Sequence, residues 1–142
     1  MPVEVKTIEN LEFFKGLAYD ELEEFASYLN PRNVAKNEAL LREGTPALTF
    51  FIVLSGRYKV SLKGGKSYAL ARKGTVIGWS TVIGPFQYTG TATAETEGSV
   101  LYISSQEFFR LIQNNNLLGE KIMRKINKIA ADRRALVSDE AS

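Results

Sequence analysis

The residues best suited to binding chemistry in this chain lie in one segment, residues 77–94, which reads IGWSTVIGPFQYTGTATA. Gly78 and Gly84 bracket a run short enough for a single helical turn, and Ser80 and Thr81 place hydroxyl groups at its start. Free backbone N–H groups at the start of such a turn form a seat for an anion. The segment holds no Lys, Arg, Asp or Glu, so a ligand here would be held by backbone groups, hydroxyls and aromatic rings.

The residue types of the whole chain argue against most catalytic chemistry. There is no Cys and no His among the 142 residues, which excludes disulfides, thiol catalysis and thiolate metal sites. It also removes the commonest general base and the commonest metal ligand. Glu43 with Glu95 is the one acid pair that position suggests. We therefore predict that the chain is not an enzyme, with no catalytic residues, no metal and no cofactor.

Composition places the chain among globular proteins. Apolar residues make up 44% and charged residues 24% of the sequence. A length of 142 residues suits one domain, which we expect to span 1–142. No apolar run approaches the length of a membrane span, and the N-terminal MPVEVKTIEN lacks the apolar stretch of a secretion signal. These features predict a soluble, cytoplasmic protein with no membrane association.

The middle of the chain is basic. Between Glu43 and Glu95 there is no acidic residue, and the cations in that interval are Arg57, Lys59, Lys63, Lys66, Arg72 and Lys73. One interpretation is that the field of the domain attracts a small anionic or nucleotide-like ligand or an anionic partner. The other is that lysines at strand edges and turns serve solubility and discourage edge-to-edge pairing.

The elements that position these residues are predicted to be helices, then strands, then helices. Apolar residues at helical spacing predict short helices within 8–29, one over 10–16 and one over 19–29. Residues 32–103 carry short β-rich runs between recurrent glycines, with KGGK at 63–66 as a hairpin turn and 49–54 as a buried strand. Residues 105–137 are predicted to be helical, with Ser104 or Ser105 as the cap. This order predicts a mainly β fold, a roll or a sandwich, with flanking helices.

Five short motifs in this order resemble the cyclic nucleotide-binding domain family, the sensor module of the catabolite activator protein. They are Phe13-Phe14-Lys15-Gly16-Leu17, Leu40-Leu41-Arg42-Glu43-Gly44, Phe51-Ile52-Val53-Leu54-Ser55-Gly56-Arg57, Ile77-Gly78 and Phe108-Phe109-Arg110-Leu111-Ile112. The likeness extends from residue 10 to about 137. It implies an eight-stranded jelly-roll-like β-roll, a cupin-like double-stranded β-helix, with short N-terminal helices and a long C-terminal helix. It also implies a role in regulation and signal transduction, with the ligand cassette in residues 77–94.

The cassette departs from the pattern of that family. The resemblance implies a glutamate for the ribose hydroxyl and an arginine for the cyclic phosphate, and the matching positions hold Trp79 and Tyr88. Losing an arginine–phosphate pair from a desolvated site costs on the order of 2 to 5 kcal/mol. Tight binding of cyclic AMP or cyclic GMP is therefore not expected. The candidate residues of this degenerate cassette are Gly78, Trp79, Ser80, Thr81, Val82, Tyr88 and Thr89.

Trp79, the single tryptophan, allows two interpretations. Its indole could stack on a planar ligand. Alternatively it folds into the cavity and fills the space of a nucleotide, with Tyr88 closing the far side. We expect Pro85 and Phe86 to extend the same apolar wall.

The predicted C-terminal helix carries a heptad-like seam. Its members, spaced four, three, four and three residues apart, are Ile122, Ile126, Ile129, Arg133 and Leu136. The seam predicts a homodimer interface, and a single arginine within it would fix the register. In the alternative, the isoleucines pack on the roll of their own chain. The resemblance also implies that residues near Arg133 and Arg134 reach toward a ligand.

Other known roles of the fold find little support in the residues. After Val137 only SDEAS remains, which is too short and too acidic for a helix-turn-helix, so we expect no DNA-binding domain in this chain. Haem sensing is disfavoured by the missing His and Cys. Two functions are left: a stand-alone regulatory sensor whose ligand is not a tightly bound cyclic nucleotide, or a ligand-free dimerisation or docking module with the pocket filled by Trp79.

Overall fold

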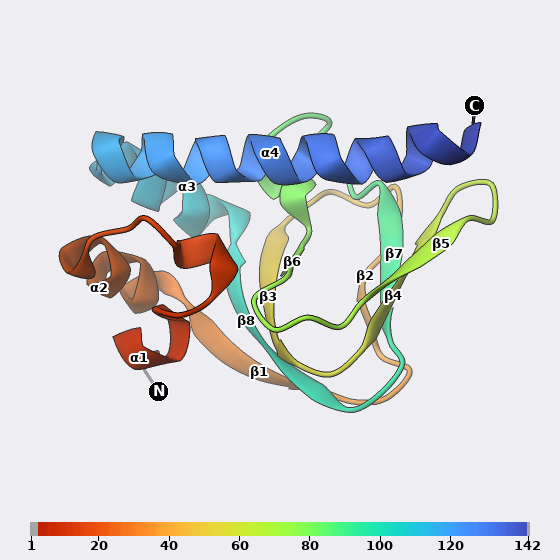
Figure 1. Ribbon diagram of the computed structural model, residues 1–142, viewed down its shortest axis with the longest axis horizontal. Helices are drawn as coiled ribbons and strands as arrows, with labels where there is room; N and C mark the ends of the chain where they lie inside the picture. Colours follow the sequence, from red (N-terminus) through yellow and green to blue (C-terminus); the bar gives the residue numbers. More distant parts are fainter. Residues whose placement is uncertain (1–2, 142) are drawn as a thin grey trace.

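The computed structural model describes residues 3–141, with side chains to residue 136 (Figure 1). The N-terminal helical elements are α1 (Val5–Ile8), the 3-10 helix η1 (Glu12–Phe14) and α2 (Tyr19–Tyr28). The strands are β1 (Asn30–Val34), β2 (Ala39–Leu41), β3 (Thr49–Ser55), β4 (Tyr58–Leu62), β5 (Ser67–Leu70), β6 (Val76–Ile77), β7 (Gly90–Ala94) and β8 (Gly98–Ser104). The 3-10 helix η2 (Trp79–Thr81) lies between β6 and β7, and the chain ends in α3 (Ser105–Asn114) and α4 (Asn116–Ala141).

The eight strands form two antiparallel four-stranded sheets. One sheet has the order β1-β8-β3-β6 and the other β2-β7-β4-β5. In Figure 1 the first sheet faces the N-terminal helices and the second closes the far side of the roll, while α4 runs across one end of both. The prediction of a mainly β, eight-stranded roll with flanking helices and a long C-terminal helix is confirmed.

Strand β3 shows why its sequence is apolar at nearly every position. Phe50 and Ile52 pack into the cluster under the helices, whereas Phe51 and Val53 pack inside the roll. Successive side chains of a strand point to opposite faces, so a strand covered on both faces needs an unbroken apolar run. The run at 49–54 therefore indicated a strand at the centre of the molecule.

Local predictions succeed where a specific turn or cap is required. The hairpin over 63–66 joins β4 and β5, with Gly64 and Gly65 at φ of 98° and 93°. Ser104 caps α3, because its hydroxyl accepts a hydrogen bond from the N–H of Glu107 at 3.2 Å. The short helical turn predicted over 10–16 is present as the three-residue η1, whereas α1 lies before it and was not predicted. Phe13 and Phe14 of η1 are both buried.

Helix α4 is fastened to the rest of the chain by its first half. Leu118, Ile122, Ile126 and Ala130 repeat every four residues and have no exposed surface. At Gly119 a Cβ atom would lie 2.9 Å from the carbonyl oxygen of Ile112, so glycine lets α4 approach α3 closely. The apolar stripe of this half is therefore part of the core of its own chain.

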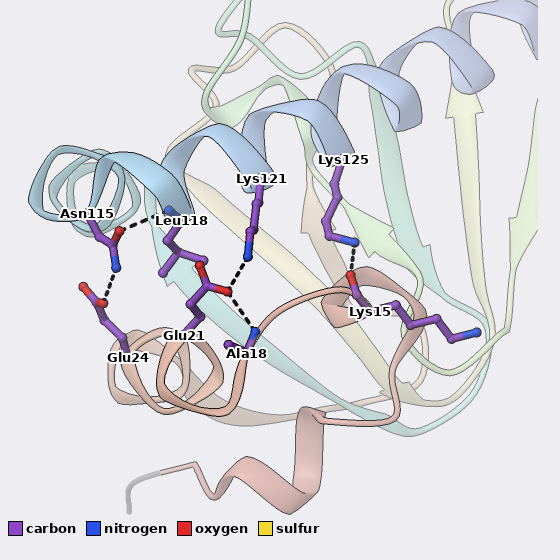
Figure 2. A network of polar contacts seen from close by, with 8 residues as sticks. All are labelled: Lys15, Ala18, Glu21, Glu24, Asn115, Leu118, Lys121 and Lys125. Atoms are coloured by element: carbon purple, nitrogen blue, oxygen red, sulfur yellow. Dashed lines mark hydrogen bonds and ion pairs between the residues drawn. The ribbon is translucent and has the colours of Figure 1, made fainter.

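A polar network reinforces that attachment (Figure 2). Lys121 on α4 pairs with Glu21 on α2, with Nζ 2.7 Å from the carboxylate, and the same carboxylate accepts the N–H of Ala18 at 2.8 Å. The hydrogen bond from Lys121 is the main reason that the pKa of Glu21 lies below its ordinary value. One turn along, Lys125 donates to the carbonyl oxygen of Lys15, and burial lowers the pKa of Lys125.

The same packing bears on the predicted dimer seam. Ile122 and Ile126 are completely enclosed and Ile129 packs against the same core, so the predicted use of the two enclosed isoleucines in a dimer interface needs correction. The alternative interpretation, packing on their own chain, describes these residues. Arg133 is half-buried, and Leu136, 47% exposed, is the one seam residue with a largely open side chain.

Candidate ligand-binding site

The turn after β6 brings the cassette backbone against β3. Gly78 adopts a φ of 91°, and a Cβ atom there would lie 2.9 Å from the carbonyl oxygen of Thr49, so only glycine fits. The Thr81 hydroxyl donates to the carbonyl oxygen of Gly78 at 2.6 Å, and the carbonyl oxygen of Thr49 lies 3.2 Å from the same hydroxyl. Ser80 and Thr81 are buried. The Thr81 hydroxyl therefore serves the turn itself.

Tyr88 reaches across the roll to the same strand. Its phenol donates to the carbonyl oxygen of Thr49 at 2.8 Å and accepts the N–H of Thr49 at 2.9 Å. The side chain is only 8% exposed. Burial raises the pKa of the Tyr88 phenol, and the hydrogen bonds with Thr49 counter part of that rise. The hydrogen bonds of the neutral Tyr88 phenol therefore connect the segment before β7 to the start of β3.

Trp79 lies between the helical core and the site. It is 6% exposed and belongs to the apolar cluster under the helices. From α4, the guanidinium carbon of Arg134 lies 5.0 Å from the centre of the indole ring, a cation–π distance. The neighbouring Arg133 donates from Nη2 to the carbonyl oxygen of Val76 at 2.7 Å. Two consecutive arginines of α4 therefore contact β6 and the first residue of η2.

These side chains divide the site into two unequal cavities. The inner cavity, between Gly78, Tyr88 and the strands of the roll, has a volume of about 20 Å³. The outer cavity, under the second half of α4, has a volume of about 500 Å³. Four residues line both cavities and form the boundary between them: Tyr68, Trp79, Thr89 and Arg133.

The outer cavity combines apolar walls with positive charge. Leu62, Tyr68, Trp79 and Pro85 supply the apolar surface. Three cations line it, Lys63 from the β4–β5 hairpin and Arg133 and Arg134 from α4. In Figure 1 the tip of that hairpin rises toward the C-terminal part of α4. The cations of the lining therefore come from two separate elements.

The structure gathers most, but not all, of the candidate residues. Gly78, Trp79, Ser80, Tyr88 and Thr89 line the inner cavity. Val82 instead packs into the helical core. Pro85 lines the outer cavity, whereas Phe86 is 51% exposed and does not line it, so the predicted apolar wall ends at Pro85.

Three residues of the outer cavity escaped the sequence analysis as site residues: Leu62, Lys63 and Tyr68. They come from the β4–β5 hairpin, 9 to 15 residues before the start of the cassette at residue 77. The basic character of the middle of the chain was the one signal that pointed toward them.

Glu43 and Glu95, the acid pair that position suggested, lie near opposite ends of β7. The backbone N–H of Glu43 donates to the Thr91 hydroxyl near the start of β7, whereas Glu95 follows the end of that strand and pairs with Arg57 at 2.9 Å. Among the residues that the structure describes, no three metal-ligating side chains gather in one place. No helix between residues 3 and 141 is both long and apolar enough to cross a membrane.

A match to a protein-family model identifies the family of this chain. The model of the cyclic nucleotide-binding domain matches residues 31–115, from β1 through the end of α3. The chain belongs to this family. The resemblance inferred from the sequence motifs is confirmed, and the inner cavity lies where that resemblance implied the cassette.

Solved structures of this fold show the same architecture. A protein of Geobacter metallireducens GS-15 described as a cyclic nucleotide-binding protein is 20% identical, with a TM-score of 0.82 over 92% of this chain and 98% of that chain. The regulatory subunit of a cAMP-independent protein kinase A from Trypanosoma brucei, as a triple mutant bound to cAMP, is 17% identical, with a TM-score of 0.75 over 89% of this chain and 45% of that chain. At these identities the likeness concerns the fold alone.

Curated relatives are much longer proteins. A stretch of 51 residues, 36% of this chain, is 45% identical to the Acetyltransferase Pat of Mycolicibacterium smegmatis and covers 15% of it. Three NTE family proteins, from Mycobacterium bovis and Mycobacterium tuberculosis, match 122 residues at 25% identity and 21% of their own length. The chain thus spans about a fifth or less of the curated relatives it matches.

Proposed function

We propose that this chain is a regulatory sensor domain whose ligand is neither cyclic AMP nor cyclic GMP bound tightly in the inner cavity. The observation that carries the proposal is the Tyr88 phenol, which bonds both backbone groups of Thr49 in the place expected for a phosphate. The space that remains, about 20 Å³, has room for about one water molecule.

The charges near the inner cavity support the same conclusion. A cyclic phosphate carries a negative charge, and moving it into a desolvated cavity requires a cation or several donors. Among the residues that the structure describes, Arg133 is the one cation that lines the inner cavity, and its guanidinium already donates to the carbonyl oxygen of Val76. A nucleotide would have to break that bond and displace Tyr88 as well.

The outer cavity gives a sensor a place for another ligand and a way to report it. Arg133 and Arg134 line it from α4, so a ligand there would contact the helix directly. The proposed signal is a change in how the second half of α4 lies over Trp79. A ligand can shift that equilibrium only by as much as it prefers one helix position over the other.

Titration with cyclic nucleotides tests the proposal. We expect no saturable change in Trp79 emission and no calorimetric heat with cyclic AMP or cyclic GMP up to millimolar concentration. The converse experiment is the double variant Trp79→Glu, Tyr88→Arg, followed by calorimetry because the tryptophan is gone. A gain of affinity would show that the two replacements had abolished an existing seat. Micromolar binding by the unmodified chain would refute the proposal.

One neighbour supports the logic of the double variant. The Trypanosoma brucei subunit is named cAMP-independent, and the form bound to cAMP carries an arginine in place of a threonine, beside two changes to alanine. That mutant and the double variant proposed for this chain both introduce an arginine. The matched control here is Tyr88→Phe, which removes the bonds to Thr49 without adding charge, and which should not gain cyclic nucleotide affinity.

A second candidate function is a ligand-free dimerisation or docking module. The burial of Trp79 in the helical core favours it, because an indole at 6% exposure already fills space that a ligand would need. A homodimer through α4 would have to use Leu136 and the outward side of the helix, since Ile122 and Ile126 are enclosed. Sedimentation velocity at high micromolar concentration tests this: a dimer whose affinity falls with Leu136→Glu supports the module, and a monomer argues against it.

A further inference from the structure

We propose that the outer cavity binds a small organic monocarboxylate with an apolar body, either aliphatic or aromatic. The inference rests on the proposed function, because it names the class of ligand that replaces the cyclic nucleotide. It follows from the size of the cavity, the chemistry of its walls and the distribution of charge around it.

The size and walls of the cavity determine the body of the ligand. A volume of about 500 Å³ lies in the ordinary range for small-molecule sites, about 300–1,000 Å³. Leu62, Tyr68, Trp79 and Pro85 present apolar surface, while Thr89 adds a neutral hydroxyl beside that of Tyr68. Because the walls offer few neutral polar groups, they suit a ligand whose body has few polar atoms. A nucleobase or a sugar would leave its own donors and acceptors unpaired here.

The charges determine the head of the ligand. Lys63, Arg133 and Arg134 all line the cavity, and no Asp or Glu does among the side chains described, which extend to residue 136. Its walls between residues 62 and 89 contain no acid, because the sequence has none between Glu43 and Glu95. Asp132, the acid beside the two arginines in sequence, pairs at 3.5 Å with Lys128 one turn back along α4. An anion entering the cavity therefore meets three cations, with no acid among the described lining residues to repel it.

The arginine geometry favours a carboxylate head. A guanidinium offers five N–H donors in one plane, matched to the two oxygens of a carboxylate. Arg133 uses one of its nitrogens on Val76, and Arg134 lies over the ring of Trp79. A carboxylate at the edge of these guanidinium groups would leave its apolar body against Trp79, Tyr68 and Leu62. The carboxylate head matches the cations of the lining, and the apolar body matches its apolar residues.

Matched pairs of acids and amides test the proposal, with the single tryptophan as reporter. The probes are octanoate and 3-phenylpropanoate, and the controls are octanamide and 3-phenylpropanamide, which keep the body and remove the charge. Acetate and inorganic phosphate supply the head without the body. We expect saturable changes in Trp79 emission and calorimetric heat with at least one of the acids, with at least about tenfold weaker binding of its amide and of the head-only anions.

Three results would overturn it. If neither acid binds saturably, the cavity does not take this class of ligand. If amides bind as well as acids, the cations play no part. If acetate or phosphate binds as well as the longer acids, the apolar walls play no part. Tight binding of cyclic AMP would instead refute the proposed function, so failure of the two proposals is distinguishable.

Single variants connect the binding to the named cations. Lys63→Gln and Arg134→Gln should each weaken acid binding about fivefold and leave amide binding unchanged, since each removes one partly solvated charge. Lys63 is the cleaner test because the structure records no contact between its charge and Trp79. The control is Lys36→Gln, an exposed cation between β1 and β2 that does not line the cavity. Equal loss in Lys36→Gln would mean that only the overall charge of the domain matters.

Discussion

The two halves of α4 are held in different ways. In the first half, four enclosed apolar residues and the Lys121–Glu21 pair bind the helix to α2 and α3. In the second half, from residue 131 to 136, the described side chains are exposed or half-buried. The attachments described there are made by two arginines, Arg133 to Val76 and Arg134 over Trp79.

This difference shows how one helix can be both scaffold and reporter. Apolar burial is strong and insensitive to small ligands, whereas a partly solvated arginine contact is weak and can be exchanged for a ligand contact. The second half lies over the outer cavity, so the part of α4 that is easiest to move is the part that would meet a ligand. Four changes test this comparison.

The largest expected effect comes from the core of the first half. Ile122→Ala should lower the free energy of unfolding by about 2–5 kcal/mol, because it opens a cavity among enclosed residues. The matched change in the second half, Leu136→Ala, should stay within about 0.5 kcal/mol, since that side chain is half exposed. Urea unfolding followed by circular dichroism measures both. Similar losses in the two variants would contradict the division of α4.

The polar link between α4 and α2 should contribute less. Glu21→Gln keeps an oxygen for the N–H of Ala18 but removes the charge that pairs with Lys121. We expect a loss of about 1–2 kcal/mol, from weakening a charged hydrogen bond at a mostly buried carboxylate. A double-mutant cycle with Lys121→Met isolates the pair. Additive losses in that cycle would show that the pair does not couple the two helices.

The same pair predicts a smaller effect of pH. The pKa of Glu21 is lowered in the folded chain from its ordinary 4.5, mainly by the hydrogen bond from Lys121. The unfolded chain therefore binds this proton first as pH falls, so the stability from Glu21 is complete above about pH 4.5 and is lost as pH drops below it. Unfolding free energy should fall less steeply below that pH in Glu21→Gln than in the unmodified chain. If the unfolding free energies of the two proteins fall in parallel with pH, groups other than Glu21 cause the pH dependence.

The smallest effect on global stability should come from the second half. Arg133→Gln removes the hydrogen bond to Val76 at a half-buried position, which should lower the free energy of unfolding by at most about 1 kcal/mol. Hydrogen exchange should accelerate at residues 131–136 while residues 118–130 keep their protection, because only the second half loses its attachment. Lys128→Gln is the control. Acceleration along all of α4 would mean that the helix moves as one unit.

Much of the fold could be predicted from the sequence because local rules fixed it. The apolar run at 49–54, the glycine pair at 64 and 65 and the cap at Ser104 each express a requirement of the adjacent backbone. The family motifs then implied an eight-stranded β-roll with flanking helices. The short turn over 10–16 was predicted and is present as η1, whereas α1 was missed because its four residues are too few to show a helical period.

For the site, the sequence by itself determined the absences: no charged residue in the cassette, no histidine or cysteine, and Trp79 and Tyr88 at the two family positions. Only the tertiary structure decided what those residues do. Whether Tyr88 fills the inner cavity depends on the backbone of Thr49, 39 residues away, and whether Ile122 faces a partner or its own chain depends on α2 and α3. Periodicity shows that a helix has an apolar stripe, but only the packed neighbours determine what covers it.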